Sequence, residues 1–564
     1  MMAKRMRLIF DVPSGTGGSM GVSSLAARRS ELFTFCLIVL CWGIFDAFVV
    51  PPAFGNTDIY YFKDAGINFA QGLGLTTRFT FGNPTFEYEA FATYPPIYTL
   101  LFGLHTRIFG TSLAANQLFN SMLALMLGAM GFLVLRRIVR EAAPGRLSGW
   151  TVVAVGMASV ATGYFMPPND RPDGLGVIFG VLAIVSAVRG RTARSAVAAG
   201  GLCALALLTS PFAGIWTSLA IVPAILARPS NEATRVTGVK RIGLVAACGM
   251  ATVVVALLVL RYTLPGWFDA FVGVVTGADT HNETGGGYFL ALLKGDVRTW
   301  WSGFPAASAA AAVGWVRLAA VQAALLAAII VDRIRARSNW QAWRLIPVLI
   351  LSPLCFITSP YQTNYPPITA ALLLVVWASI ASLTSPTSRK ISGTSIFVAF
   401  TAVAALGAPL EARTLLTRFA AHESIDRART FISSHRAEFD RPGRFIAVSP
   451  SNYMVWREAG VRPLITTYSG FDSPVNRERL DYVALAFPGS SDLLQPQSPQ
   501  WLSDVEYVQA HRPQLPQPAR IFTRQLSNSS QTWESELWTR RACTSCVTSF
   551  AQSPAVNRTG STER

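Results

Sequence analysis

The sequence predicts an all-α domain of about eleven transmembrane helices, followed by a small α/β domain outside the membrane. Of 564 residues, 51% are hydrophobic and only 14% are charged, and the mean hydropathy is +0.37. Segments such as 32–52 and 242–260 supply the roughly 20 apolar residues with which a helix crosses a bilayer. After residue 411 the charges are spread evenly and short β-prone runs appear. These observations predict a polytopic membrane protein with a separate C-terminal domain.

The basic residues lie between the apolar segments and do not gather in one patch. Because cationic loops remain in the cytoplasm, each basic group marks a cytoplasmic loop. The formal charge of +17 therefore reports membrane topology and predicts no nucleic-acid partner. The groups are Arg136, Arg137, Arg140 and Arg146; Arg189, Arg191 and Arg194; Arg228, Arg235, Lys240 and Arg241; Arg333, Arg335, Arg337 and Arg344; and Arg389 with Lys390.

An odd number of spans places the two ends of the chain on opposite faces of the inner (plasma) membrane. Residues 1–31 are then a cytoplasmic tail, and residues 32–410 form the transmembrane domain, with long outer loops at 53–112 and 263–304. The predicted spans lie near 32–52, 113–135, 149–167, 174–188, 195–209, 212–227, 242–262, 305–331, 344–358, 366–384 and 391–409.

The sequence pattern of residues 411–540 predicts a small α/β domain on the periplasmic or extracellular side. We expect a helix over 411–437 and strands within 444–450, 463–468 and 482–487. The last stretch, 541–564, has the polar composition of a disordered tail. It carries Cys543 and Cys546, and the sequence leaves open whether they form a disulfide.

Asp58 lies a few residues beyond the first predicted span, at the membrane–water boundary. A carboxylate there is suited to act as a general base on an acceptor, since partial dehydration raises its basicity. The alternative is that Asp58 only caps a helix end. Further along the same loop, the apolar segment 96–109 contains His105 and is too short to cross the bilayer comfortably. It predicts a helix lying on the outer leaflet, introduced by Tyr94 to Pro96 and ended by Gly110.

A second cluster of charge occurs in residues 163–180, which read GYFMPPNDRPDGLGVIFG. Asp170, Arg171 and Asp173 lie beside lipid-facing sequence, where charges without a role are costly. Arg171 is the favoured cation for a departing phosphate, followed by Lys63 and two residues of the second outer loop. Those two are Lys294 and Arg298. The alternatives are that Asp173 complements the dipole of a helix beginning at Pro172, and that the lysines and Arg298 anchor to lipid headgroups.

An acidic residue follows the first span and begins the run DIYY, which is followed by AGINFAQGLG. A YPP then precedes an apolar helix that ends in FG, and RPD comes later in the sequence. This set of motifs resembles the GT-C superfamily of membrane glycosyltransferases. Members use polyprenyl-linked glycosyl donors. The resemblance implies that Asp58 is the catalytic base or binds the acceptor, and that Asp170 or Asp173 is a second acid near the donor phosphate or a metal ion.

This sequence departs from parts of the superfamily. Asn56 and Thr57 precede Asp58, so a paired acid is missing there, although Asp64 follows. No W-W-D motif is present, so peptide N-glycosylation is not expected. Nothing in the sequence requires a cofactor; a divalent cation, if one binds, would lie near Asp170 or Asp173. The histidines lack zinc-site spacing.

The predicted function is inverting transfer of a sugar from a polyprenyl-phosphate donor to a glycan, lipid or protein acceptor on the outer face of the membrane. Residues that could also contact substrate are Lys63, Tyr94, His105, Lys294 and Arg298. The alternative is a transporter or a flippase of lipid-linked sugars. Few charges lie within the predicted spans and the acids gather at outer loop ends, which favours an enzyme.

Overall fold

The computed structural model describes thirteen longer segments of the chain and, besides them, isolated residues within 33–44, 346–377 and at 395. The segments are 58–78, 88–92, 94–142, 171–189, 192–226, 232–276, 309–335, 422–439, 445–448, 453–465, 480–486, 507–511 and 535–540.

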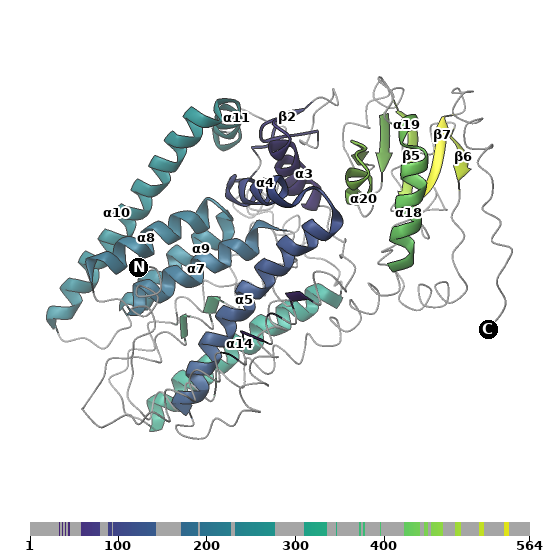
Figure 1. Cartoon of the computed structure of the whole chain (residues 1–564). Helices are drawn as coiled ribbons and strands as arrows, with labels where there is room; N and C mark the ends of the chain where they lie inside the picture. The colour runs from purple at the N-terminus through teal and green to yellow at the C-terminus, as the bar shows by residue number, and fades with distance from the viewer. Residues whose placement is uncertain are drawn as a thin grey trace, which may run out of the picture.

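Six long helices occupy positions at which spans are predicted, so these segments are confirmed as helical (Figure 1). The other five predicted spans, 32–52, 149–167, 344–358, 366–384 and 391–409, lie wholly or mostly outside the described residues. The six helices are α5 (Leu113–Ala142), α7 (Pro172–Arg189), α8 (Ala193–Leu207), α9 (Pro211–Leu226), α10 (Glu232–Thr263) and α14 (Ala309–Arg335).

Helix α10 is the best-defined membrane helix among the described residues. Its segment Gly238–Thr263 has 26 residues and a mean hydropathy of 2.6, which suits a bilayer crossing. Large apolar side chains such as Met250, Val255 and Val259 are exposed along it, and α10 lies at the edge of the bundle in Figure 1. An exposed apolar face is what lipid would cover. The apolar segments of the other described helices are shorter, so the number of spans stays a prediction.

The first outer loop is folded where it is described. It holds α3 (Asp58–Ala70), the short antiparallel pair β1 (Thr76–Thr77) and β2 (Glu89–Ala90), and α4 (Ile97–Phe109). As predicted, the apolar segment forms a short helix that ends at Gly110, whose φ of 85° favours glycine. Thirteen residues span about 20 Å, well short of a bilayer. Its place on the outer leaflet stays a prediction.

Helices α3 and α4 cross with their backbones almost in contact. A Cβ atom placed on Gly103 would lie 2.8 Å from the carbonyl oxygen of Gly66. Only glycine at position 103 permits this crossing without a shift of backbone, because a Cβ essentially never comes so close to another heavy atom. The crossing thus fixes α3 against α4.

The second outer loop begins with a helix that the sequence analysis did not predict, α11 (Pro265–Thr276). Pro265 occupies its first position, which suits a helix start. Trp267 is buried against Leu75 and Ala92 of the first outer loop, and its ring stacks on Phe271 at 5.0 Å. The two outer loops therefore pack together. Residues 277–308 lie outside the described part.

Residues after 422 form helices and a five-stranded mixed sheet in the order β4-β3-β5-β7-β6. Strand β3 pairs in parallel with β4 and β5, whereas β7 is antiparallel to β5 and β6. The three predicted strands are confirmed as β3 (Phe445–Val448), β4 (Leu464–Ile465) and β5 (Leu480–Ala486); β6 (Tyr507–His511) and β7 (Ser535–Arg540) were not predicted. The helices are α18 (His422–Ser434), α19 (Arg436–Phe439) and α20 (Tyr453–Glu458).

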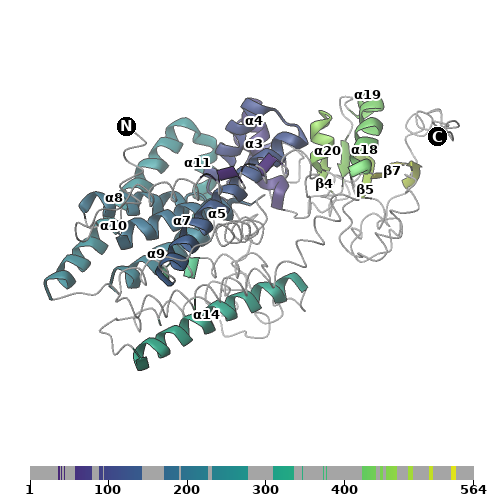
Figure 2. The same cartoon turned by 60° about the horizontal axis from the view of Figure 1, so that its bottom comes forward.

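The folded first outer loop lies between the helical bundle and the C-terminal sheet. In both views α3 and α4 are found between α11 on one side and α20 on the other (Figures 1 and 2). This arrangement places α3 and α4 between elements from two other parts of the chain. The boundaries of the domains, and the side of the membrane on which the sheet lies, stay predictions.

The crossing of α3 and α4 yields a first prediction. Gly103→Ala should destabilise the protein by about 1–3 kcal/mol, because the added methyl group overpacks a backbone contact. The measurement is the melting temperature of the detergent-solubilised protein. Gly243→Ala is the matched control, since a Cβ on Gly243 of α10 meets nothing within 4 Å. Equal melting temperatures for the two variants would show that the crossing is looser than described.

Candidate active site

The N-terminal turn of α3 faces the YPP segment. Asp58 is the first residue of α3, and its side chain lies outside the described residues. Phe62 follows one helical turn later, so positions 58 and 62 share a face of the helix. The Phe62 ring is buried and stands edge-on to Tyr94 at 4.9 Å and to Tyr98 at 6.0 Å. The face of α3 that carries position 58 therefore packs toward Tyr94.

The RPD sequence forms a buried ion pair at the start of α7. Pro172 and Asp173 open the helix as predicted, and Arg171 Nε donates to Asp173 Oδ2 at 2.9 Å. Ser210, which precedes α9, donates its hydroxyl proton to Asp173 Oδ1 at 2.6 Å. Arg171 and Asp173 are only 2% and 1% exposed. Asp173 thus complements the helix dipole and also holds the guanidinium.

Close packing of α7 against α9 brings these groups together. A Cβ on Gly176 would lie 2.8 Å from the Ser210 Cβ and 2.9 Å from the Ala213 Cβ. The glycine lets the two helices approach until Ser210 reaches Asp173. Such small residues are common where helices pack in membranes.

The two predicted parts of the site meet through the chain that precedes α4. The backbone N–H of Ile97 donates to the carbonyl of Leu208 at 3.4 Å, and Leu208 lies in the turn that leads to Ser210. Helix α4 also contacts α7 directly. Residues 94–97 therefore contact α3 through Phe62 and the α8–α9 turn through Leu208. The structure brings the N-terminal half of α3 and the start of α7 to one region.

Lys63 lies in the protein interior and contacts α5. Its ammonium group donates to the side-chain oxygens of Asn116 and of Asn120, the latter at 3.0 Å, and lies 5.2 Å from the centre of the Phe102 ring. These contacts join α3 to α5. A role for Lys63 in substrate binding stays a prediction, and so does one for Tyr94.

His105 joins α4 to the start of α5. Its Nε2 lies 2.8 Å from the carbonyl oxygen of Ala115. Burial lowers the pKa of His105 below its ordinary value, and the charge of Lys63 lowers this pKa further, although the bond to Ala115 opposes both. A neutral imidazole must carry its proton on Nε2 to make this bond. This geometry gives His105 a structural contact and leaves its substrate role a prediction.

Asp64, noted in the sequence only because it follows Asp58, is the centre of a buried network. Its Oδ2 accepts from Asn68 Nδ2 and Thr77 Oγ1, both at 3.1 Å. Its Oδ1 accepts from the Tyr453 hydroxyl and pairs with Arg457 Nε at 3.4 Å. Arg457 Nη2 also donates to Asn68 Oδ1 at 2.9 Å. We call these five residues the Asp64 network; it links the first outer loop to α20.

Burial and nearby charge shift the pKa values of two members of the Asp64 network, Tyr453 and Arg457. Burial raises the pKa of the Tyr453 hydroxyl well above its ordinary value, and the negative charge of Asp64 raises it further. Burial alone would lower the pKa of Arg457, but Tyr453 and Asp64 raise it overall. The phenol therefore remains a donor and the guanidinium remains charged across the physiological range.

Three predicted site residues, Asp170, Lys294 and Arg298, lie outside the described residues. Within the described part of the chain, no group of three or more His, Cys, Asp or Glu side chains could hold a metal ion. Both oxygens of Asp173 accept hydrogen bonds, from Arg171 and Ser210. A metal ion at Asp173 would have to compete with these donors.

Some residues of this region could have been found from local sequence signals. Ser210 precedes a proline that opens an apolar run, which is a helix-start signal. Asn116 and Asn120 are polar residues at helical spacing within a predicted span, where polar side chains usually have a role. Tyr453 and Arg457 carry no such signal, because their partners lie 389 residues away.

Comparison with known proteins gives a distant structural likeness. No protein-family model matches the sequence, and no characterised protein matches it by sequence. The apo form of the Archaeoglobus fulgidus oligosaccharyltransferase aligns with 14% identity over 80% of this chain and 69% of its own, with a TM-score of 0.46. ArnT from Cupriavidus metallidurans, bound to undecaprenyl phosphate, aligns with 14% identity over 90% of this chain and 98% of its own, with a TM-score of 0.42.

Both solved structures are GT-C glycosyltransferases, the superfamily that the sequence resembles. Identities of 14% with TM-scores below 0.5 are too low to transfer the role of any residue to this chain. The contacts of this chain's own side chains are therefore the basis for the roles proposed for its residues.

The contacts of Ser210 yield a second prediction. Ser210→Ala should destabilise the protein by about 1.5–3 kcal/mol, because the charged Asp173 carboxylate loses the hydrogen bond from the Ser210 hydroxyl. The matched control is Ser218→Ala on α9, an exposed residue whose hydroxyl donates to the carbonyl of Gly214 at 2.8 Å and contacts Cys203 but, among the described residues, bonds to no carboxylate. Its effect should stay within about 0.5 kcal/mol. Thermal melts of both variants in detergent provide the comparison, and a neutral Ser210→Ala would contradict the described bond.

Proposed function

We propose that this chain is a membrane glycosyltransferase that moves a sugar, with inversion, from a polyprenyl-phosphate donor to an acceptor on the outer face of the inner membrane. The observation that carries the proposal is that residues 94–97 contact α3 through Phe62, one turn after Asp58, and also contact the α8–α9 turn, whose Ser210 bonds to Asp173 of α7. Helix α3 carries the proposed base, and Arg171 next to α7 is the proposed cation.

Asp58 is the proposed general base. The acceptor attacks the anomeric carbon while the bond from that carbon to the phosphate oxygen breaks, and the proton of the acceptor passes to the Asp58 carboxylate. Inversion requires the base and the leaving phosphate to lie on opposite sides of the sugar. Helix α3 and the start of α7 are separate elements, which suits this division of roles.

Arg171 is the proposed partner of the departing phosphate. Leaving groups of this kind need positive charge near the oxygen that gains electrons. A guanidinium has a rigid fork of N–H donors that matches two phosphate oxygens. Asp173 binds Nε and is itself held by Ser210, so the plane of the guanidinium is set before substrate arrives. Asp170 precedes Arg171 in the sequence, and it is the proposed second acid, with which a divalent cation could share the phosphate.

The surroundings of the site support the proposed donor class. A polyprenyl chain dissolves in the hydrocarbon layer, and the exposed apolar side chains of α10 indicate where that layer contacts the protein. The acceptor is a glycan, a lipid or a protein on the outer side. The C-terminal sheet is proposed to contribute to its binding, because the Phe445 ring of β3 has its centre 6.0 Å from Arg78 Cζ of the first outer loop. Lys63, Tyr94 and His105 are proposed to support the site.

A transporter or flippase of lipid-linked sugars is the second candidate. It is favoured by the buried polar side chains on α5, namely Asn116, Gln117, Asn120 and Ser121, because polar groups inside a membrane bundle often mark a path. The chemistry separates the two candidates. Glycosyl transfer releases one polyprenyl phosphate for each sugar transferred, whereas transport leaves the lipid-linked sugar intact.

A third prediction tests the proposed base. In a strain lacking this chain, a polyprenyl-phosphate sugar should accumulate, and the wild-type chain should restore its turnover. Asp58→Asn should lower that turnover about 10²–10⁴-fold, the usual contribution of a general base. Lipid extracts analysed by mass spectrometry report both the donor and the released polyprenyl phosphate.

Asp269→Asn is the matched control for this prediction. Asp269 is an exposed carboxylate on α11, so the change removes the same charge from another outer helix. It should leave turnover at the wild-type rate. Wild-type turnover by Asp58→Asn, at equal protein abundance, would exclude the mechanism proposed, and intact donor with no released polyprenyl phosphate would favour transport.

A fourth prediction tests the location of the C-terminal sheet. Arg462 is exposed at the segment that leads into β4, whereas Arg194 is exposed at the start of α8 and belongs to a predicted cytoplasmic loop. In a background lacking Cys543 and Cys546, Arg462→Cys should react with an impermeant maleimide added to spheroplasts, and Arg194→Cys should be protected. Labelling of both variants after lysis confirms that each thiol is accessible. The reverse pattern would overturn the proposed orientation.

A further inference from the structure

Helix α20 contacts two helices that belong to the other end of the sequence. Tyr453 and Arg457 bond to α3, and Glu458 bonds to the first residue of α5. We infer that α20 is a positioning element for the proposed active site: it holds α3, and with it Asp58, in a single register against α5. This inference rests on the proposed function, which assigns Asp58 its role.

The contact with α3 spans one full helical turn. Asp64 and Asn68 are four residues apart and lie on the same face of α3. Arg457 reaches both, with Nε at 3.4 Å from Asp64 and Nη2 at 2.9 Å from Asn68. A two-point contact from one rigid guanidinium opposes rotation of the helix as well as sliding. Asp58 is six residues before Asp64, about 9 Å along the axis, so a rotation at Asp64 is passed directly to Asp58.

The contact with α5 acts at a helix N-terminus. Glu458 Oε1 accepts the backbone N–H of Leu113 at 3.0 Å. A carboxylate is favourable there because the first N–H groups of a helix have no partner within the helix. Arg429 donates twice to Glu458, at 2.7 Å and 3.0 Å, and so fixes the direction of the carboxylate. The start of α5 is thereby tied to the same short helix as α3.

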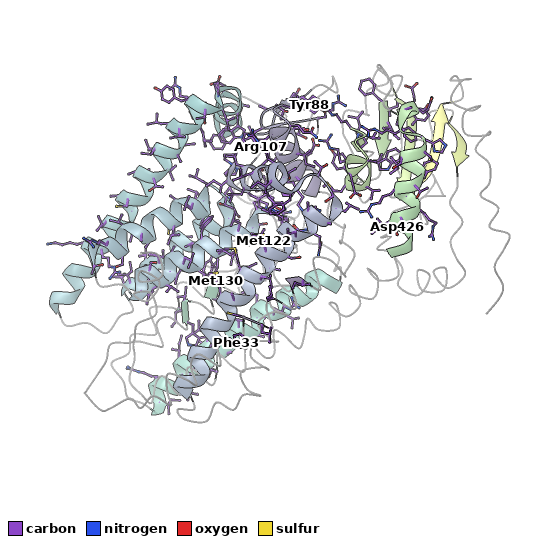
Figure 3. The ribbon with its side chains drawn as sticks, in the orientation of Figure 1. Phe33, Tyr88, Arg107, Met122, Met130 and Asp426 are labelled. Carbon is purple, nitrogen blue, oxygen red and sulfur yellow. The ribbon has the colours of Figure 1, made fainter. Side chains whose placement is uncertain are left out.

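A third contact closes the arrangement. Lys63, next to Asp64 in α3, donates to Asn116 and Asn120 of α5. Helices α20, α3 and α5 are thus joined pairwise, and none can move without breaking bonds to the other two. In Figure 3, side chains fill the space between the first outer loop, near the labelled Tyr88, and the C-terminal helices, near the labelled Asp426.

The polar character of the contact distinguishes positioning from simple packing. Asp64 is 2% exposed and Arg457 is 6% exposed, so both charges are removed from water at a large cost. Apolar side chains of similar volume would often bind two elements as strongly. Hydrogen bonds of fixed direction restrict the register of α3 against α20. The Asp64 network therefore fixes the orientation of α3 relative to α20.

The test uses the full-length protein in nanodiscs of phosphatidylethanolamine and phosphatidylglycerol. Arg457→Met removes both contacts to α3. Hydrogen–deuterium exchange of the α3 amides should become at least about tenfold faster, because local opening becomes easier, while exchange in α8 and α9 should not change. Arg462→Met is the matched control, since Arg462 is exposed on the same segment. Unchanged α3 exchange in Arg457→Met would overturn the inference.

Arg457→Lys separates positioning from a general structural role. Lysine can keep the ion pair with Asp64, but it cannot reach Asp64 and Asn68 together with a rigid fork. We expect this variant to melt close to the wild type and yet to transfer sugar about 10²-fold more slowly, as small misplacements of a reacting group do. The donor probe is the polyprenyl-phosphate sugar extracted from the strain lacking this chain. Its KM should change little and kcat should fall.

The outcomes distinguish this inference from the proposed function. Wild-type kcat in Arg457→Lys would show that only the charge of Arg457 matters and would overturn the inference. If Arg457→Met does not fold, Tyr453→Phe replaces it, because that variant keeps the ring and loses only the bond to Asp64. A wild-type protein that transfers no sugar would refute the proposed function, while the exchange data would still decide whether α20 holds α3.

Discussion

The buried ion pair between Asp64 and Arg457 is the constraint on which the arrangement of the outer region depends. It joins residues 393 positions apart in number, and it is the centre of a network in which Asn68, Thr77 and Tyr453 supply the remaining bonds. Neither charge could be buried alone, because an unpaired charge in a protein interior costs several kcal/mol. In the folded protein, contacts from α20 therefore complete the register of α3. The helix that begins with the proposed catalytic base is thus held by a part of the chain that is distant in sequence.

Asp173 shows how one side chain can meet a structural and a chemical requirement together. It occupies the first turn of α7, where a carboxylate complements the helix dipole, and the same carboxylate binds Arg171 and Ser210. The two interpretations that the sequence left open are therefore compatible. A carboxylate that is already stabilised by a helix N-terminus can hold a cation in the interior at lower cost. The cation is then oriented in advance, which is the property that a phosphate-binding group needs.

Local patterns predicted the elements that depend on nearby residues. Apolar length placed α5 and α7 to α10, the Pro172 signal placed the start of α7, Gly110 placed the end of α4, and β-prone runs placed β3, β4 and β5. Helix α11 was missed although Pro265 is a local helix-start signal, whereas the other missed elements depend on distant partners. Strands β6 and β7 are stabilised by pairing with each other and with β5. The six residues of α20 are too few to form a stable helix alone. Asp64 was overlooked as a site of contact because nothing near it in sequence reveals Tyr453 or Arg457.

The Asp64 network also limits the possible membrane topology. A hydrogen bond requires both partners on the same side of the bilayer, so the first outer loop and α20 share a side. The chain between α4 and α20 must then cross the membrane an even number of times, whichever face that side is. Ten of the eleven predicted spans fall in this interval, which meets the condition without fixing the number. Helices α5, α7, α8, α9, α10 and α14 lie within it. Any revision of the span count between these two points must therefore add or remove spans in pairs, because one span added alone would separate Arg457 from Asp64 by the thickness of the bilayer.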